Sequence, residues 1–247
     1  MLVARAACSL SSHPLMPDPE TKIALLAGAS GLVGGCLLDA LLDAQDYTRI
    51  LAVTRRPLAR DDPRLANRVV AYDKLDAQLA GITCHTAFCC LGTTIRAAGS
   101  QAAFRQVDLD YVLTFARVAK AAQAQRFLVI SAAAADPSAK NFYLRTKGEM
   151  EEGLTALRFA SLDIFQPGPL LGWRREMRPL ELAVCAVMPL LNPLLLGSFS
   201  AYRAIAATTL ARAMVRCARS GRRGVYRYTY RDIVALSNKK TKRPLAA

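Results

Sequence analysis

The chain has 247 residues, 53% of them hydrophobic, and a formal net charge of +14. This length fits one large α/β domain, and because no uncharged apolar run reaches about 18 residues, no ordinary transmembrane helix is predicted. The basic residues gather in the last third without interleaved aromatic residues, which argues against a specific nucleic-acid partner. Seven cysteines without a Cys-x-x-Cys pair, and only His13 and His85 beside them, argue against a metal site.

The two ends of the chain differ from its middle. Residues 1–20 lack periodicity and end in a Pro-Asp-Pro breaker, so we expect a disordered N-terminal extension there. Cysteines that read as reduced, buried thiols and the absence of a convincing secretory signal favour a cytoplasmic protein, although Arg5 in an acid-free stretch leaves an organelle signal open. Residues 238–247 read as a basic tail, which leaves a single dinucleotide-binding domain over 21–237.

The segment from Ile23 to Cys36 predicts a strand, a glycine turn and a helix. Residues 23–27 are an apolar run, and leucines recur at helical spacing from residue 32 onward. The glycines between them are three apart, which permits a tight turn and leaves open amides at the helix start, where a pyrophosphate binds. A glycine turn without a ligand is the alternative. The residues expected at the cofactor are Gly28, Ser30, Gly31, Leu32, Val33 and Gly34.

A second strand, Arg49 to Val53, ends in Thr54-Arg55-Arg56-Pro57. An NAD site carries an acidic residue about 20 positions past the glycines, whereas arginine there suits the 2′-phosphate of NADP. The acid is missing here and two arginines are present, so the sequence favours NADP(H), with Arg55 ahead of Arg56 as the phosphate ligand. A plain surface Arg-Arg turn is the alternative.

Two further strands are expected before the middle of the chain. The third, Val69 to Tyr72, is closed by Asp73, whose carboxylate is placed to accept a bond from the adenine amine. The fourth, Thr86 to Leu91, ends in small residues that let the backbone pass beside a cofactor: Gly92, Thr93 and Thr94. A helix from about residue 101 to 124 follows, capped by Ser100.

A fifth strand, Arg126 to Ile130, places Ser131 at its carboxyl end, where open α/β sheets carry their chemistry. The helix that follows carries Tyr143 and Lys147, which lie four apart and therefore share one helix face. A phenol with a pKa near ~10 is a poor proton donor and base at neutral pH until a nearby cation favours its phenolate. Ser131, Tyr143 and Lys147 are the predicted catalytic residues.

A sixth strand, Leu162 to Phe165, leads into Pro167 and Gly168, a rigid turn that we expect to border the nicotinamide. Residues 168–237 read as a small substrate-side region. Its expected parts are an apolar stretch at 182–197 that suits a lid, a dimer face or a membrane surface, a helix at 208–219, and a strand at 224–230.

Taken together, these motifs resemble a known family. The segments are Gly28 to Gly34, Cys90-Leu91-Gly92-Thr93-Thr94, Val107-Asp108-Leu109-Asp110-Tyr111-Val112, Ser131, Tyr143 with Lys147, and Pro167-Gly168. They are similar to those of the atypical short-chain dehydrogenase/reductases, in the Tat-interacting oxidoreductase-like branch, over roughly residues 22 to 235. Leu-Gly-Thr-Thr followed by Val-Asp-x-Asp-Tyr-Val is the most diagnostic piece.

The resemblance implies a Rossmann-like, doubly wound parallel α/β sheet that binds NADP(H). It also implies that Ser131 bonds the substrate oxygen, that Tyr143 exchanges the proton, and that Lys147 holds the nicotinamide ribose and tunes Tyr143. The expected function is therefore hydride transfer between NADP(H) and a small carbonyl or alcohol substrate.

The alternative is a catalytically weak NADPH-binding regulator, associated with a partner or, through 182–197, with a membrane surface. Under either function, we expect the chain to be a monomer or a homodimer.

Overall fold

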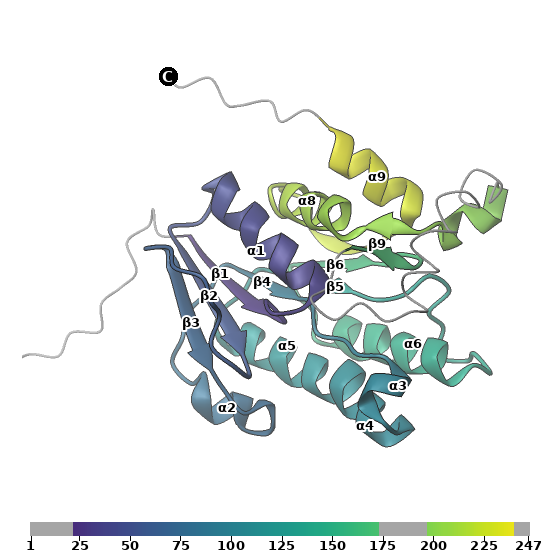
Figure 1. Ribbon diagram of the computed structural model, residues 1–247, viewed down its shortest axis with the longest axis horizontal. Coiled ribbons are helices and arrows are strands. Elements are labelled where there is room, and N and C mark those ends of the chain that lie inside the picture. The colour runs from purple at the N-terminus through teal and green to yellow at the C-terminus, as the bar shows by residue number, and fades with distance from the viewer. Residues whose placement is uncertain (1–21, 173–196, 240–247) are drawn as a thin grey trace, which may run out of the picture.

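The computed structural model describes residues 22–172 and 197–239. Within these two segments, seven parallel strands form the main sheet in the order β3-β2-β1-β4-β5-β6-β9 (Figure 1). The strands are β1 (Ile23–Ala27), β2 (Arg49–Thr54), β3 (Leu65–Val69), β4 (Thr86–Cys89), β5 (Arg126–Ile130), β6 (Ser161–Phe165) and β9 (Gly224–Tyr228). The strand order reverses between β1 and β4, and in open α/β sheets such a reversal marks where ligands bind, at the carboxyl ends of the strands. The predicted Rossmann-like fold is confirmed.

Helices cover both faces of the sheet (Figure 1). One face carries α1 (Leu32–Ala44), α8 (Ala207–Ala218) and α9 (Tyr230–Asn238). The other carries α2 (Leu75–Gln78), α5 (Tyr111–Ala121) and α6 (Phe142–Ala156). Alternate residues of β1 point to opposite faces, so Leu25 packs under α5 while Leu26 packs under α1. A parallel sheet covered on both sides explains why its strands read as continuous apolar runs.

The remaining elements are short. They are a 3₁₀ turn η1 (Tyr72–Lys74), α3 (Ile95–Ala98), α4 (Gln101–Arg105), a π-helical turn (Gln106–Asp110), a 3₁₀ segment η4 (Gly197–Tyr202), and the strands β7 (Leu170–Leu171) and β8 (Ile205–Ala206), which pair with each other. The helix expected over about 101–124 is thus α4, the π-helical turn and α5 in succession. Strand β9, expected in a separate substrate-side region, joins the main sheet beside β6.

The predicted position of the third strand was wrong. The strand is Leu65–Val69, and Tyr72 starts the turn η1 instead of ending a strand. Because β3 is an edge strand, its residues are half-buried or exposed, and Asn67 and Arg68 interrupt the apolar pattern that a buried strand shows. Tyr72 is buried for another reason, since its hydroxyl donates to the Val53 carbonyl at 3.0 Å.

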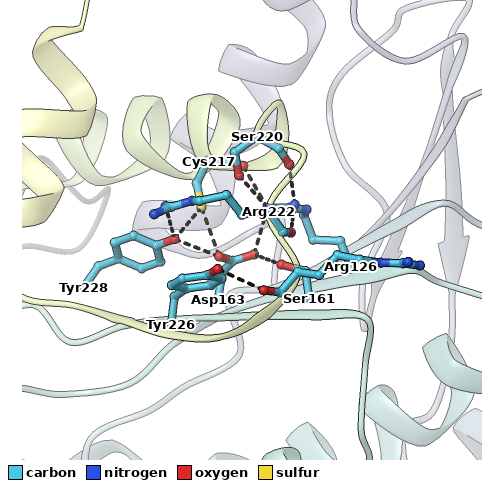
Figure 2. A network of polar contacts seen from close by, with 9 residues as sticks. Arg126, Ser161, Asp163, Cys217, Ser220, Arg222, Tyr226 and Tyr228 are labelled. Carbon is cyan, nitrogen blue, oxygen red and sulfur yellow. Dashed lines mark hydrogen bonds and ion pairs between the residues drawn. The ribbon is translucent and has the colours of Figure 1, made fainter.

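A buried polar network fixes α8 and β9 to the sheet near the amino ends of β5 and β6 (Figure 2). Asp163 on β6 accepts hydrogen bonds from Arg126, Ser161 and the Tyr228 hydroxyl at 2.8–3.0 Å. The Arg126 guanidinium also donates to three carbonyls where α8 ends and β9 begins, those of Cys217, Ser220 and Arg222. Because every partner belongs to the fold, this network is structural.

Three expectations fall on residues outside the described segments. They are the N-terminal extension at 1–20, most of the apolar stretch at 182–197, and most of the basic tail. Among the helices of residues 22–172 and 197–239, none is both long and apolar enough to cross a bilayer.

Candidate functional site

The turn between β1 and α1 requires glycine at two positions. Gly28 has φ +83°, and a Cβ on it would lie 2.6 Å from the Cys90 carbonyl oxygen at the end of β4. A Cβ on Gly34 would lie 2.0 Å from the carbonyl oxygen of Gly28. Gly28 therefore lets the turn approach the neighbouring strand, and Gly34 lets α1 begin directly against the turn.

The start of α1 is built to receive an anion. Gly31 occupies the N-cap position without a side-chain cap, and the first helical hydrogen bond runs from Gly35 to Gly31 at 2.8 Å. The amides of Leu32, Val33 and Gly34 come before that bond, so they point out of the helix end without helical partners. Ser30 and Gly31 are exposed beside them. The residues present therefore fit a dinucleotide pyrophosphate, as the glycine spacing predicts.

Arg55 and Arg56 are exposed just after β2, the strand next to β1. Within the described segments neither guanidinium has a hydrogen bond or ion pair. Thr54 fixes the backbone of this turn to β3, because its hydroxyl donates to the Arg56 carbonyl at 2.8 Å and accepts from the Asn67 side chain at 2.8 Å. Asp73 is exposed in η1 beyond the end of β3.

The loop after β4 lies beside the glycine turn, since the Cys90 amide donates to the Ala27 carbonyl at 2.9 Å. Gly92 is exposed, and the Thr94 hydroxyl caps α3 by accepting from the Ala97 amide at 3.1 Å. The Thr93 amide donates to Asp108 Oδ2 at 2.8 Å. One carboxylate therefore fixes the loop over which a cofactor would lie.

Asp108 was missing from the predicted site, yet it is the partner of Lys147. Its Oδ1 lies 2.7 Å from Lys147 Nζ, and both side chains are buried. Asp108 belongs to the π-helical turn, a local widening of the helix that often marks functional positions. Burial alone lowers the pKa of the Lys147 ammonium, but Asp108 and Tyr143 oppose this, and the pKa ends above its usual value.

Tyr143 and Lys147 come together in the first turns of α6, as their spacing predicts. The Tyr143 ring packs 5.6 Å from that of Phe104, measured between ring centres. Burial raises the pKa of the Tyr143 phenol; Lys147 lowers it and Asp108 raises it, with a net pKa above the ordinary value. The tuning by Lys147 that the sequence predicts is thus present, but burial and Asp108 outweigh it.

Ser131 lies at the carboxyl end of β5 as predicted, and its hydroxyl is bound to a second buried acid that the sequence analysis missed. It donates to Glu151 Oε1 at 2.6 Å, and Gln166 donates to the same oxygen at 2.8 Å. Arg227 on β9 binds Glu151 Oε2 at 2.8 Å. Tyr143, Lys147 and Glu151 are successive i, i+4 positions on α6, a repeat visible in the sequence that would have revealed Glu151.

The turn at Pro167 and Gly168 follows β6 on the same edge. The Ala133 amide donates to the Pro167 carbonyl at 3.0 Å, which ties this turn to the loop after β5. A Cβ on Gly168 would lie 2.5 Å from the Arg203 carbonyl oxygen, so only glycine permits this close packing against the chain after η4.

The predicted residues therefore lie along one edge of the sheet. Those after β1, β2, β4, β5 and β6 are at the carboxyl ends, and α6 brings Tyr143 and Lys147 to the loop after β4. Within the residues that the structure describes, no group of three or more His, Cys, Asp or Glu side chains is arranged to hold a metal ion.

Comparisons with known proteins show the family and the fold of this chain. No protein-family model matches the chain. Protein HTATIP2 of Rattus norvegicus is 39% identical over 166 residues, which cover 66% of this chain and 68% of that protein. The chain belongs to the Tat-interacting oxidoreductase-like family. The family is an atypical branch of the short-chain dehydrogenase/reductases, so the resemblance drawn from the motifs is confirmed.

Fungal members of the family carry a location in their names. "Protein fmp52, mitochondrial" of Emericella nidulans is 36% identical over 163 residues, covering 63% of this chain and 70% of that protein. "Protein FMP52, mitochondrial" of Saccharomyces cerevisiae is 33% identical, covering 62% and 68%. These names contradict the prediction of a cytoplasmic protein, which was wrong: the cysteine pattern on which it rested does not distinguish the cytosol from an organelle.

Solved structures of distant sequence share the fold. "MoeE5 in complex with UDP-glucuronic acid and NAD" superposes with a TM-score of 0.63 at 17% identity, over 87% of this chain and 80% of that one. A UDP-N-acetylglucosamine 4-epimerase from Methanobrevibacter ruminantium M1 gives a TM-score of 0.64 at 14% identity, over 85% and 77%.

Proposed function

We propose that this chain is an NADP(H)-dependent oxidoreductase that reduces a carbonyl group of a small molecule or oxidises the corresponding alcohol. One observation supports the proposal most strongly: Tyr143 and Lys147 lie at the carboxyl ends of the strands, where the glycine turn also lies. Several solved structures with this fold are complexes with NAD, which supports a nicotinamide dinucleotide.

The glycine turn and the first amides of α1 would hold the pyrophosphate. Arg55 would hold the 2′-phosphate, because a guanidinium pairs with phosphate through two parallel hydrogen bonds and lies here without another partner among the described residues. Asp73 would accept a hydrogen bond from the adenine amine, and Gly92, Thr93 and Thr94 would lie beside the cofactor. Pro167 and Gly168 would border the nicotinamide.

When bound, a reduced nicotinamide supplies a hydride for the substrate's carbonyl carbon. Tyr143 donates its phenolic proton to the carbonyl oxygen, and the Lys147 ammonium stabilises the phenolate that remains. General acid catalysis of this kind contributes about 10²- to 10⁴-fold in rate. Ser131 was expected to bond the substrate oxygen, but its hydroxyl hydrogen is directed at Glu151, so Tyr143 and Lys147 carry this mechanism.

The experiment that tests the proposal compares Tyr143→Phe with wild type, using NADPH and a panel of aldehydes, ketones and quinones. We expect Tyr143→Phe to bind NADPH with unchanged affinity and to lose turnover by about 10²-fold or more, because it removes the proton donor alone. Tyr226→Phe is the matched control: its hydroxyl binds the Arg223 carbonyl at the amino end of β9, far from the site. Turnover by Tyr143→Phe equal to that of Tyr226→Phe would overturn the assignment.

A further inference from the structure

We propose that Asn67 is a positioning residue for cofactor choice: it fixes the turn that carries Arg55 and thereby raises the preference for NADPH over NADH. This inference rests on the proposed function, in which Arg55 holds the 2′-phosphate, and it deepens that function by naming the residue that orients this contact. Asn67 lies half-buried on the edge strand β3. Its hydrogen bonds explain why an amide stands there in place of an apolar side chain.

The Asn67 side chain holds both ends of the turn at residues 54–58. Its Nδ2 donates to the Thr54 hydroxyl at 2.8 Å and to the Ala52 carbonyl at 3.1 Å. Its Oδ1 accepts from the Leu58 amide at 2.9 Å. Both amide hydrogens and the carbonyl oxygen are therefore in use, and these partners permit only one orientation of the amide group.

Thr54 links Asn67 to the backbone next to Arg55. The buried Thr54 hydroxyl accepts from Asn67 and donates its one hydrogen to the Arg56 carbonyl at 2.8 Å. Pro57 stiffens the turn further, because its ring fixes its own φ and disfavours helical backbone at Arg56. The backbone that carries Arg55 is therefore held in place without any bound ligand.

A fixed turn raises the affinity of Arg55 for a phosphate. Its side chain is exposed, and its guanidinium has no hydrogen bond or ion pair in the part of the chain that the structure describes. A bidentate contact with phosphate needs one orientation of the guanidinium, and every group that is ordered on binding costs affinity. With the backbone already fixed, only the side chain has to be ordered. NADH lacks the 2′-phosphate, so this gain applies to NADPH alone.

The test measures the dissociation constants of NADPH and NADH by nicotinamide fluorescence for wild type, Asn67→Ala and Thr54→Val. In both variants we expect the preference for NADPH, the ratio of the NADH constant to the NADPH constant, to fall by about 3- to 10-fold, with NADH binding unchanged. Thr54→Ser keeps the hydroxyl and should keep the wild-type ratio. Thr48→Val is the matched control, because its hydroxyl donates to the Lys22 carbonyl just before β2 begins.

A double-mutant cycle tests whether Asn67 acts through Arg55. In the Arg55→Ala background, Asn67→Ala should lower the ratio no further, since the contact that Asn67 positions is already lost. A wild-type ratio in both Asn67→Ala and Thr54→Val, or equal weakening of NADPH and NADH, would overturn the proposal. If Asn67→Ala does not fold, the comparison of Thr54→Val with Thr54→Ser decides.

Failure of the proposed function gives a different result. If Arg55→Ala binds NADPH as tightly as wild type does, the proposed phosphate contact is absent, and the inference about Asn67 fails with it. That result appears in the single variant Arg55→Ala. Failure of the inference alone leaves the effect of Arg55→Ala intact and appears only in the variants of Asn67 and Thr54.

Discussion

Two buried acidic residues of the candidate site, Asp108 and Glu151, position the neighbouring side chains through hydrogen bonds and ion pairs. Each accepts hydrogen bonds from segments far apart in the chain: Asp108 joins the loop after β4 to α6, and Glu151 joins β5, β6 and β9 to α6. Hydrogen bonds to both oxygens of a buried carboxylate compensate for its loss of hydration. If one partner is removed, that loss is no longer fully compensated and the folded state is destabilised.

Substitution of Ser131 tests whether its hydrogen bond to Glu151 stabilises the fold or its hydroxyl takes part in catalysis. Its hydroxyl donates to the charged, buried Glu151, so we expect Ser131→Ala to lower the free energy of unfolding by about 1.5–3 kcal/mol and to leave kcat unchanged. The measurements are urea unfolding and steady-state turnover. Ser138→Ala, in the same loop but exposed, is the control.

A loss of about 10²- to 10³-fold in kcat for Ser131→Ala, without loss of stability, would instead show that its hydroxyl stabilises the charge on the substrate oxygen.

The sequence predicts individual site residues better than the side-chain contacts between residues that are distant in the chain. The placement of Tyr143 and Lys147 on one helix was predictable because their spacing is local and helical. Asp108 was not, because its pairing with Lys147 depends on how the sheet brings two distant helices together, and no local pattern encodes that contact. Glu151 continues the i, i+4 series of Tyr143 and Lys147 on α6. It was missed because its hydrogen-bond partners lie far from it in the sequence.

The helix α6 is the element on which the site depends. It is held against the loop after β5 at Gly148, where a Cβ would lie 2.1 Å from the Pro137 nitrogen. Asn141 caps its first turn by accepting from the Leu144 amide at 3.1 Å. The capped start and the close approach together fix where Tyr143 and Lys147 stand.

Gly148→Ala should therefore be severely destabilising. The added methyl meets backbone that has no room to move, and we expect a loss of about 3 kcal/mol or more, with weaker turnover in whatever fraction folds. Gly153→Ala in the same helix is the matched control: its Cβ would meet only the end of the Leu113 side chain, and alanine favours helix by about 1 kcal/mol. Thermal unfolding of both variants compares them, and equal melting temperatures would contradict the close packing at Gly148.

Elements with strong local patterns were predicted well, and edge elements were not. β1, α1, β2, β5 and α6 each combine an apolar run or a helical repeat with a clear start, and the structure has them at or near the predicted residues. β3 is half-exposed at the sheet edge, where burial does not impose an apolar pattern, and its prediction was displaced toward Tyr72.

At the scale of the whole fold, the described residues form a main parallel sheet whose order reverses beside β1. The glycine turn, the Arg55 turn and the loop after β4 all follow the carboxyl ends of strands next to this reversal. The sequence indicated this fold class through the alternation of strands and helices. It did not indicate that β9 completes the sheet, because that pairing with β6 joins strands about 60 residues apart and depends on the Arg126–Asp163 network.

The measurement that tests the central claim most directly is a titration of the purified protein with NADPH and, separately, NADH, followed by nicotinamide fluorescence. It is made for wild type, Arg55→Ala and Arg49→Ala, the last an exposed arginine at the opposite end of β2. We predict tighter binding of NADPH than of NADH. Arg55→Ala should weaken NADPH binding roughly 10- to 100-fold and leave NADH binding unchanged, because one charge-assisted phosphate contact is lost. Binding of neither dinucleotide would contradict the account.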